Sequence, residues 1–313
     1  MGTPEFAVET LKALVENDYN VVAVVTQPDK PVGRHQTEMQ PSQVKQYAVA
    51  HGLPVLQPEK MKDPEFVEQL RSYNANLQVV VAFRMLPEVV WAMPEYGTFN
   101  VHAALLPQYR GAAPINWAVI NGETQTGVTT FFLDHDIDTG RIILKKTFDI
   151  PDEADVEYVY DGLMHLGAEI CLETLEAIVA ANGHPDSIPQ DSVLDGSAIK
   201  PAPKIFKETC EIYWKKTAKQ VYDFVRGLSP YPGAWTTLVA PDGKETVLKI
   251  YKTRKTGKPG KGIGTITIEG KALCVSAADE QLEIVELQLA GKKRMMARDF
   301  LNGMKQIEDY RVK

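Results

Sequence analysis

The sequence predicts an α/β domain built on an open, mainly parallel sheet, followed by a second, smaller β-barrel domain. Its 313 residues exceed the roughly 150 residues typical of one domain. In the first part of the chain, helical patterns separate short apolar runs, which implies crossover connections between parallel strands. In the last third, the apolar period changes to two, which is typical of short strands in a small barrel.

Helices and buried strands are expected to alternate in the first domain. Residues 4–16 place apolar side chains at helical spacing, and residues 41–51 are expected to form a second helix. A long helix should carry apolar residues at steps of four, three and four from Val159 and stop near Gly183. The expected strands cover residues 21–26, 53–56, 77–83, 98–102, 128–133 and 141–148.

The start of the chain is typical of the turn after a strand. No strand precedes Gly2-Thr3-Pro4, so either the first strand is absent from this sequence or the sheet has another topology. The start lacks the basic and apolar regions of a signal peptide. No apolar run approaches the roughly 20 residues that span a bilayer. We therefore expect a cytoplasmic protein without a membrane partner.

Charge is distributed unevenly along the chain. A segment rich in Pro, Asp and Ser, residues 184–203, is interpreted as the linker between domain 1–183 and domain 204–313. Residues 1–200 hold 13 basic and 28 acidic residues, a net charge of −15, whereas residues 201–313 hold 21 and 13, a net charge of +8. This asymmetry predicts that the second domain attracts phosphate groups.

The second domain is expected to place one helix before its strands. Thr217 can cap a helix that buries Val221, Val225 and Leu228. Small barrels of about five strands include folds that bind oligonucleotides. The expected strands cover residues 246–252, 264–268, 272–276 and 281–287.

A basic run follows the first of these strands. It contains Lys252, Arg254, Lys255 and Lys258, and its simplest interpretation is a solvated loop. Within a basic domain, phosphate contact is the alternative that we favour. Because no aromatic residues interleave with the run, it would position a nucleic acid rather than stack on bases.

The stretch that begins at Asn100 carries the clearest indication of chemistry. Asn100 and His102 lie two residues apart, so their side chains face the same way in a strand. They would emerge at its carboxyl end, where open α/β sheets bind ligands. The alternative is that His102 is a core histidine with satisfied hydrogen bonds.

The loop Asp134–Gly140 holds three carboxylates between two strands. Its aspartates match the start of an EF-hand, but Thr139 stands where Gly is required and Lys145 where the last Glu is required. A zinc site with His135 lacks the usual ligand spacing. The three cysteines are far apart and are expected to be reduced core residues. A solvated acidic turn stays open, and we predict no metal.

Several motifs together resemble the methionyl-tRNA formyltransferase family over nearly the whole chain. Asn100, His102 and Asp138 match elements shared by formyltransferases that use 10-formyltetrahydrofolate, and the run from Leu105 to Pro114 is more specific. The other matching motifs are Gly2-Thr3-Pro4-Glu5-Phe6-Ala7, Gln27-Pro28-Asp29-Lys30-Pro31, Asp136-x-Asp138-Thr139-Gly140, Ser229-Pro230-Tyr231-Pro232-Gly233-Ala234-Trp235 and Ala290-Gly291-Lys292-Lys293.

The resemblance implies a Rossmann-like formyltransferase that formylates methionine on initiator tRNA for translation initiation, with 10-formyltetrahydrofolate as donor and no obligatory protein partner. It implies a catalytic set of Asn100, His102 and Asp138, with loop 133–137 beside the folate. The other implied folate-pocket residues are Phe83, Arg84, Met85, Leu86, Ala104, Leu105, Leu106 and Pro107. The expected tRNA contacts are Arg34, Arg110, Lys252, Arg254, Lys255 and Lys258.

The reaction explains why such residues are needed. The attacking α-amino group has an ordinary pKa of about 8, so part of it is uncharged near neutrality. Its attack builds negative charge on the formyl oxygen, where Asn100 and His102 can donate hydrogen bonds worth roughly 10²–10³ in rate. The amine then loses a proton. Asp138 is the expected base, directly or through water, with a gain of about 10²–10⁴.

Two places depart from the family's usual pattern. Gln36, Thr37 and Glu38 stand in loop 33–39, which in the family reaches the tRNA and is usually more basic. Ala104 stands where Ser is usual, which removes one hydroxyl from the expected folate pocket.

Three other functions are considered. A sugar-nucleotide or glycinamide formyltransferase would share the trio but lack the basic second domain. A tRNA-binding protein without catalysis would not need Asn100, His102 and Asp138. A nucleotide-dependent oxidoreductase would carry G-x-G-x-x-G after a strand, which this sequence lacks.

Overall fold

The computed structural model describes residues 1–32, 38–304 and 306–313, and the chain divides into two compact units. Both units are discontinuous in sequence. Unit 1 consists of Met1–Gly111, Gln125–Asp149 and Tyr160–Pro201. Unit 2 consists of Ala112–Thr124, Ile150–Val159 and Ala202–Lys313.

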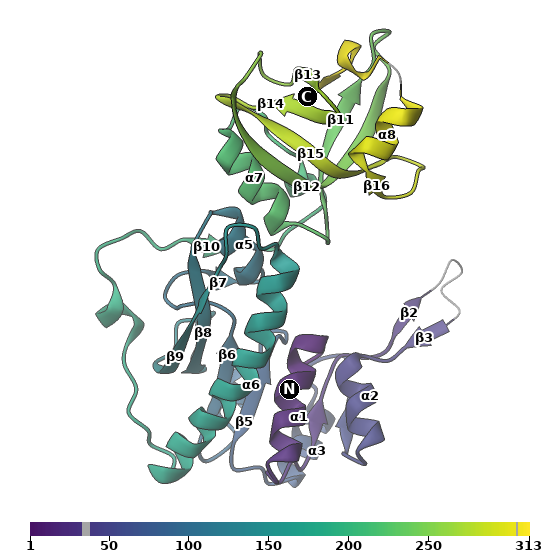
Figure 1. Ribbon diagram of the computed structural model, residues 1–313. Coiled ribbons are helices and arrows are strands. Elements are labelled where there is room, and N and C mark those ends of the chain that lie inside the picture. Colours follow the sequence, from purple (N-terminus) through teal and green to yellow (C-terminus); the bar gives the residue numbers. More distant parts are fainter. Residues whose placement is uncertain (33–37, 305) are drawn as a thin grey trace. The chain divides into compact units, whose positions relative to one another are not determined.

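The sheet of unit 1 has a parallel part and an antiparallel edge (Figure 1). Strand β1 (Val24–Val25) pairs in parallel with β4 (Val55–Leu56), and β5 (Gln78–Val81) pairs in parallel with β6 (Thr98–His102). Strand β6 then pairs antiparallel with β8 (Gln125–Phe132), and β8 with β9 (Ile142–Asp149). The predicted α/β fold with a mainly parallel sheet is confirmed.

Met1 and Gly2 lie between the two parallel pairs. The Gly2 N–H donates to the Val25 carbonyl at 3.0 Å, and the Val81 N–H donates to the Met1 carbonyl at 2.9 Å. Gly2 also forms a parallel bridge with Val81. A Cβ at position 2 would lie 2.5 Å from the Cβ of Ala7, so glycine is required by this close approach. The first two residues thus join β1 to β5.

Helices cover the sheet of unit 1, and α6 (Val156–Ala180) is the predicted long helix. It packs closely on the antiparallel edge. A Cβ at Gly162 would lie 2.2 Å from the Phe148 ring, and the hydroxyls of Thr130 and Thr174 are hydrogen bonded at 2.8 Å in the core. The other helices of unit 1 are α1 (Glu5–Glu16), α2 (Gln43–Ala50), α3 (Pro64–Ser72) and α4 (Glu88–Trp91).

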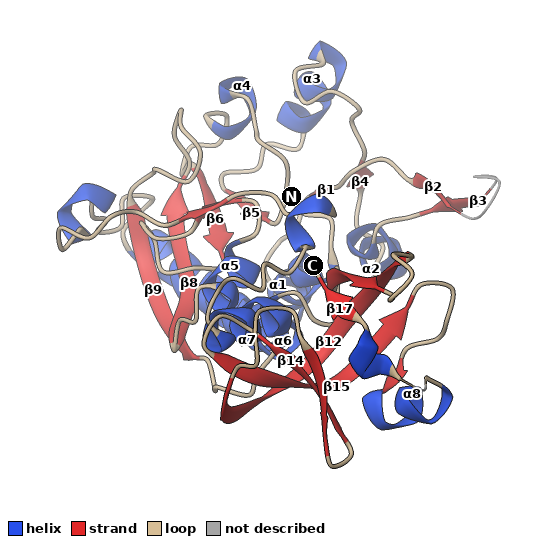
Figure 2. Ribbon diagram, turned by 90° about the horizontal axis from the view of Figure 1, so that it is seen from above, coloured by secondary structure: helices blue, strands red, loops and turns tan. Residues whose placement is uncertain are grey.

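Unit 2 is a small antiparallel barrel, seen with its strands in red in Figure 2. Its strand order is β13-β14-β15-β12-β11-β17, and a bridge between Thr265 and Arg311 connects the two ends. The bounds of its strands are β11 (Ala234–Val239), β12 (Glu245–Pro259), β13 (Ile266–Glu269), β14 (Ala272–Ser276), β15 (Glu280–Leu289), β16 (Met295–Met296) and β17 (Arg311–Val312). The predicted small barrel is confirmed.

The α-helices in the described part of unit 2 are α5 (Pro114–Ile120), α7 (Ala218–Gly227) and α8 (Ala297–Gly303). Helix α7 is capped by Thr217, as its sequence predicts, and Gln220 completes a capping box with it. It buries Val221 and Val225 in the same core as the barrel residues Leu282, Ile284 and Leu287.

The segment interpreted as a linker lies against unit 1 up to Pro201. Ile188 exchanges two backbone hydrogen bonds of 2.9 Å with Ile142 of β9. Gln190, in a 3₁₀ turn (Gln190–Val193), is only 2% exposed. At the end of the segment, the short strand β10 (Pro201–Ala202) pairs with β7 (Arg110–Gly111). The domain boundaries from the sequence stay a prediction.

The cysteines and the helices of the chain are each the subject of an expectation from the sequence. Cys171, Cys210 and Cys274 are buried and unpaired, as expected, and burial raises the pKa of Cys171 to about 12. Within the described parts of the chain, no helix has the length and apolar character needed to cross a membrane.

A substitution at Gly140 tests how closely the chain packs beside the antiparallel edge of the sheet. A Cβ there would lie 1.6 Å from the Phe132 carbonyl oxygen, so the backbone must shift. We expect Gly140→Ala to lower the free energy of unfolding by about 1–3 kcal/mol in chemical denaturation. At Gly303 an added Cβ meets nothing within 4 Å, so Gly303→Ala should change it by less than about 0.5 kcal/mol. Equal losses would contradict this packing.

Candidate active site

The candidate site begins at the carboxyl end of β6. Asn100 lies opposite Val80 of β5 and Phe131 of β8, and His102 is the last residue of the strand. Their spacing of two directs both side chains to one face of the sheet. The turn that follows is held by Thr129, whose hydroxyl accepts from the Leu106 N–H at 3.1 Å and donates to the Ala104 carbonyl at 2.6 Å.

His102 is held by one ring nitrogen. Nε2 lies 2.9 Å from the Tyr109 carbonyl oxygen. Because a carbonyl oxygen only accepts, Nε2 must carry the proton. Nδ1 faces Asp138, whose Oδ2 lies 3.9 Å away, which is longer than a hydrogen bond. Nδ1 can therefore donate to a substrate only when the ring is protonated, with the carboxylate beside it to balance the charge.

Asp138 is held in an unusual conformation. Its backbone φ of 56° lies in the left-handed region, which residues other than Gly rarely adopt. Its Oδ2 accepts the Gly111 N–H at 3.0 Å, and its carbonyl oxygen accepts from Gln190 Nε2 at 2.8 Å. Contacts with both the side chain and the backbone thus fix the carboxylate beside His102.

The other two aspartates of this loop have structural roles or point to solvent. Asp134 Oδ1 accepts from the Asp136 N–H at 3.2 Å and from the Thr139 hydroxyl at 2.7 Å, which closes the turn. Asp136 is exposed. Among the residues that the structure describes, no three His, Cys, Asp or Glu side chains are placed to share a metal ion.

Asn100 presents a buried polar atom to the site. Its Oδ1 is buried and has no hydrogen-bond partner within the described residues. Such an atom typically costs about 1–3 kcal/mol when it stays unpaired. Buried polar groups are usually paired, so this oxygen awaits a hydrogen-bond donor that the described residues do not supply.

The three segments expected to line the folate pocket come together around Leu133. This side chain packs against the apolar cluster that contains Leu86 and against the cluster that contains Leu106. The rings of Trp91 and His135 also meet edge to face, with centroids 5.4 Å apart. The segments 83–86, 104–107 and 133–137 are therefore neighbours in space.

Their individual residues differ in exposure. Met85 is 69% exposed and Ile137 58% exposed. The Arg84 guanidinium donates to the carbonyls of Pro58 and Glu59, but its Nε is buried without a partner in the described structure. Phe83 and Leu105 are half-buried; the remaining predicted pocket residues are buried, namely Leu86, Ala104, Leu106 and Pro107.

The described residues expected to contact tRNA differ in their exposure and in their partners. Arg34 lies outside the described residues. Arg110 is half-buried, and its Nε and Nη2 donate to Gln190 Oε1 at 3.0 and 2.7 Å. On β12, three cations have carboxylate partners, in the pairs Arg254–Glu283, Lys255–Asp152 and Lys258–Glu269. Lys252 is exposed. These ion pairs reduce the positive potential that the basic run predicts.

Two contacts of the site were not predicted from the sequence. The Tyr109 carbonyl fixes the ring of His102, and Gln190 binds both Arg110 and the loop of Asp138. Gln190 stands in a polar stretch without periodicity, so no sequence signal distinguishes it from a linker residue.

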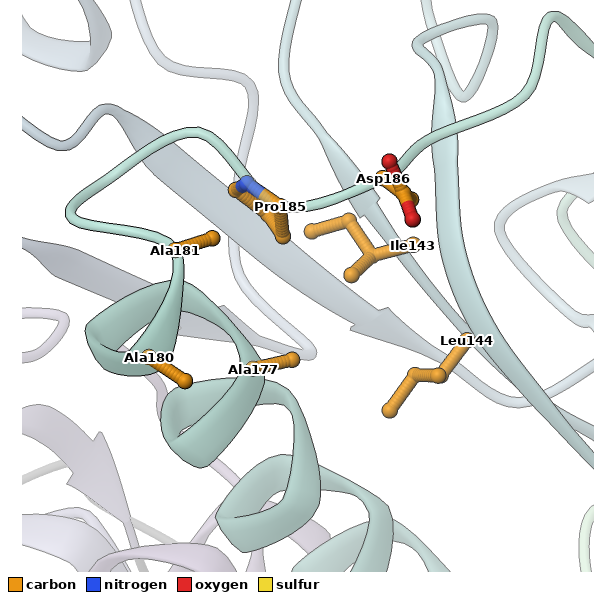
Figure 3. A pocket seen from close by; sticks show the side chains of 7 residues that line it. All are labelled: Ile143, Leu144, Ala177, Ala180, Ala181, Pro185 and Asp186. Atoms are coloured by element: carbon orange, nitrogen blue, oxygen red, sulfur yellow. The ribbon is translucent and has the colours of Figure 1, made fainter.

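Two cavities of unit 1 lie away from this site. Figure 3 shows a pocket of ≈ 340 Å³ between the end of α6 and β9, with Asp186 as its only charged lining residue. A larger one of ≈ 860 Å³ lies beside Met1 and α1. Neither is lined by any of the predicted site residues that the structure describes, so neither cavity belongs to the candidate site.

Two family models match the chain, one in each half of the sequence. Residues 1–175 match the model described as formyl transferase, and residues 204–305 match the model of the formyl transferase C-terminal domain. The protein is thus a formyl-transferring enzyme.

Individual relatives narrow this class. The chain is 59% identical to the methionyl-tRNA formyltransferase of Parabacteroides distasonis, over the whole chain and 97% of that protein. It is 55% identical to that of Bacteroides fragilis, over the whole chain and 96% of that protein. The chain belongs to the methionyl-tRNA formyltransferase family.

A solved structure supports the fold alone. The sugar 3N-formyl transferase WlaRD, crystallised with dTDP and 5-N-formyl-THF, superposes with a TM-score of 0.63 at 18% identity. The match covers 93% of this chain and 97% of that one.

Asp138 provides the sharpest test of the site. Asp138→Asn keeps the shape and the acceptor for Gly111 but removes the base. We expect kcat for formyl transfer to fall by about 10²–10⁴, with the thermal midpoint little changed. Asp149→Asn is the matched control, because Asp149 is an exposed carboxylate of unit 1 that accepts from Gln125 at 2.9 Å. Near-parental turnover of Asp138→Asn would show that this site is wrongly assigned.

Proposed function

We propose that this enzyme transfers the formyl group of 10-formyltetrahydrofolate to the amino group of methionine on initiator tRNA, for translation initiation. The proposal is carried by the grouping of Asn100, His102 and Asp138 at the carboxyl end of β6. The tRNA substrate is supported by two relatives named methionyl-tRNA formyltransferase, which match the whole chain at 55–59% identity. The enzyme acts in the cytoplasm and needs no obligatory protein partner.

The residues around the trio fit a folate. The exposed apolar side chains of Met85 and Ile137 offer surface to an aromatic ring system. The unpaired Nε of Arg84 and Oδ1 of Asn100 offer one donor and one acceptor. 10-Formyltetrahydrofolate supplies the formyl group. Segments 83–86, 104–107 and 133–137 hold it.

Each residue of the trio has a distinct role. The Asn100 amide and Nδ1 of protonated His102 donate hydrogen bonds to the formyl oxygen, where negative charge develops. The Asp138 carboxylate takes the proton that the amine loses, directly or through water. The bond between the formyl carbon and the tetrahydrofolate nitrogen then breaks, and that nitrogen takes up a proton as the leaving group. Tyr109 and Gly111 act through their backbone: the Tyr109 carbonyl orients the imidazole, and the Gly111 N–H orients the carboxylate.

The second domain positions the tRNA. In this proposal residues 1–183 form the catalytic domain, 184–203 the linker and 204–313 the tRNA-binding domain. Arg34 and Arg110 contact the acceptor end, and the basic residues of β12 contact phosphates, Lys252, Arg254, Lys255 and Lys258 among them. Phosphate contacts add affinity and salt dependence without sequence specificity.

The acceptor decides between this function and its closest rival. We would measure transfer of labelled formyl from 10-formyltetrahydrofolate to methionyl initiator tRNA, free methionine and a UDP-amino sugar in parallel. Label on the tRNA alone is expected. Label on the amino sugar would instead indicate a sugar formyltransferase, and no label on any acceptor would contradict an enzymatic function.

A substitution at Glu269 tests the proposed tRNA-binding surface. Its carboxylate binds Lys258 at 3.0 Å and Lys261 at 2.9 Å, and these lysines lower its pKa to about 2, so the pairs persist at neutral pH. Glu269→Gln releases both lysines. We expect tighter tRNA binding with a steeper dependence on salt, by about 0.7–0.9 in the slope for each additional phosphate contact.

Glu211→Gln changes the net charge equally at an exposed position elsewhere in unit 2 and should have a smaller effect in filter-binding titrations over a range of salt concentrations. Conversely, neutralising Lys252, Arg254, Lys255 and Lys258 together should weaken binding and flatten the salt slope. Equal slopes in all variants would place the tRNA surface elsewhere.

A further inference from the structure

We propose that Gln190 is a positioning residue that holds the loop of Asp138 in register with His102. The inference deepens the proposed function, since it rests on Asp138 as the base of formyl transfer. Gln190 comes from the segment that the sequence indicates as a linker, and none of the motifs that carry the family resemblance includes it.

The side-chain amide of Gln190 is fully used. It is 2% exposed. Its Oε1 accepts from Nε and Nη2 of Arg110 at 3.0 and 2.7 Å. Its Nε2 donates to the carbonyls of Asp138 and Gly140 at 2.8 and 2.9 Å. A guanidinium only donates and a carbonyl only accepts, so the orientation of the amide is fixed.

These contacts connect the two loops that hold the catalytic pair. Arg110 stands between Tyr109, whose carbonyl binds His102 Nε2, and Gly111, whose N–H binds the Asp138 carboxylate. Gln190 joins this loop to the backbone of Asp138 from the other side. One amide therefore sets the separation of the loop that orients the imidazole from the loop that carries the base.

The conformation of Asp138 requires such support. Its φ of 56° is rarely adopted by residues with a side chain, and such a conformation persists only where surrounding contacts determine it. The Gly111 N–H holds the carboxylate, and Gln190 Nε2 holds the carbonyl. Without Gln190 the backbone on both sides of Thr139 loses its donor, and the carboxylate can move away from the attacking amine.

Two substitutions separate the halves of the amide. Gln190→Met keeps the length of the side chain and removes all four hydrogen bonds. Gln190→Glu keeps the acceptor for Arg110 but places an oxygen against the carbonyls of Asp138 and Gly140. If the donor half positions the base, both variants lose activity. If the contact with Arg110 were sufficient, Gln190→Glu would restore it.

The experiment measures kcat and KM for formyl transfer to methionyl-tRNA, together with thermal unfolding of each variant. We expect kcat to fall about 100-fold in both Gln190 variants, the loss typical of misplacing a reacting group by about 1 Å, with KM for 10-formyltetrahydrofolate little changed. Gln78→Ala is the control for loss of a buried glutamine in unit 1. Its Oε1 accepts from the Thr98 hydroxyl at 3.1 Å, and this variant should keep the parental kcat.

A double-mutant cycle with Asp138→Asn distinguishes positioning from general stability. Once the base is absent, Gln190→Met should lower kcat little further, because the two residues act as one unit. Equal losses in the two backgrounds, or parental kcat in Gln190→Glu, would overturn the role of Gln190 while the site stands. Parental kcat in Asp138→Asn alone would overturn the proposed site itself, and this inference with it.

Discussion

The hydrogen bond between His102 Nε2 and the Tyr109 carbonyl is the constraint on which the candidate site depends. It fixes the proton on Nε2 and turns Nδ1 toward Asp138, 3.9 Å from its carboxylate. The bond forms because the chain folds back after β6, and Thr129 holds that turn through two hydrogen bonds. A substitution in this turn would therefore alter the orientation of the His102 imidazole even though the three residues of the trio were unchanged.

The sequence predicts the strands of the site better than its loops. A period of two places Asn100 and His102 on one face of β6, because that alternation is a local property of extended chain. The role of Asp138 is expected only from the family resemblance, because a loop has no regular spacing that would single out one of its three aspartates. Gln190 could not be found, because its partners lie 50 to 80 residues away in the chain. Strand β11 was not predicted, although Ala234–Val239 alternates in burial.

The division into units also exceeds what a sequence pattern shows. Residues 112–124 and 150–159 belong to the carboxy-terminal unit although they precede the basic segment 201–313. The charge asymmetry correctly describes composition, yet it overstates the potential at β12. There Glu283, Asp152 and Glu269 neutralise three of the cations in the basic run. Counting charges cannot reveal such partners, because pairing depends on register between strands.

The measurement that tests the account most directly is the ring nitrogen NMR of His102 in protein labelled with ¹⁵N-histidine, assigned by a His102→Asn variant. We predict that the neutral ring carries its proton on Nε2, where the Tyr109 carbonyl accepts it. A neutral ring with the proton on Nδ1 and a bare Nε2 would contradict the account, because the imidazole would then not be held by Tyr109 and Nδ1 would not be the atom that acts on the substrate.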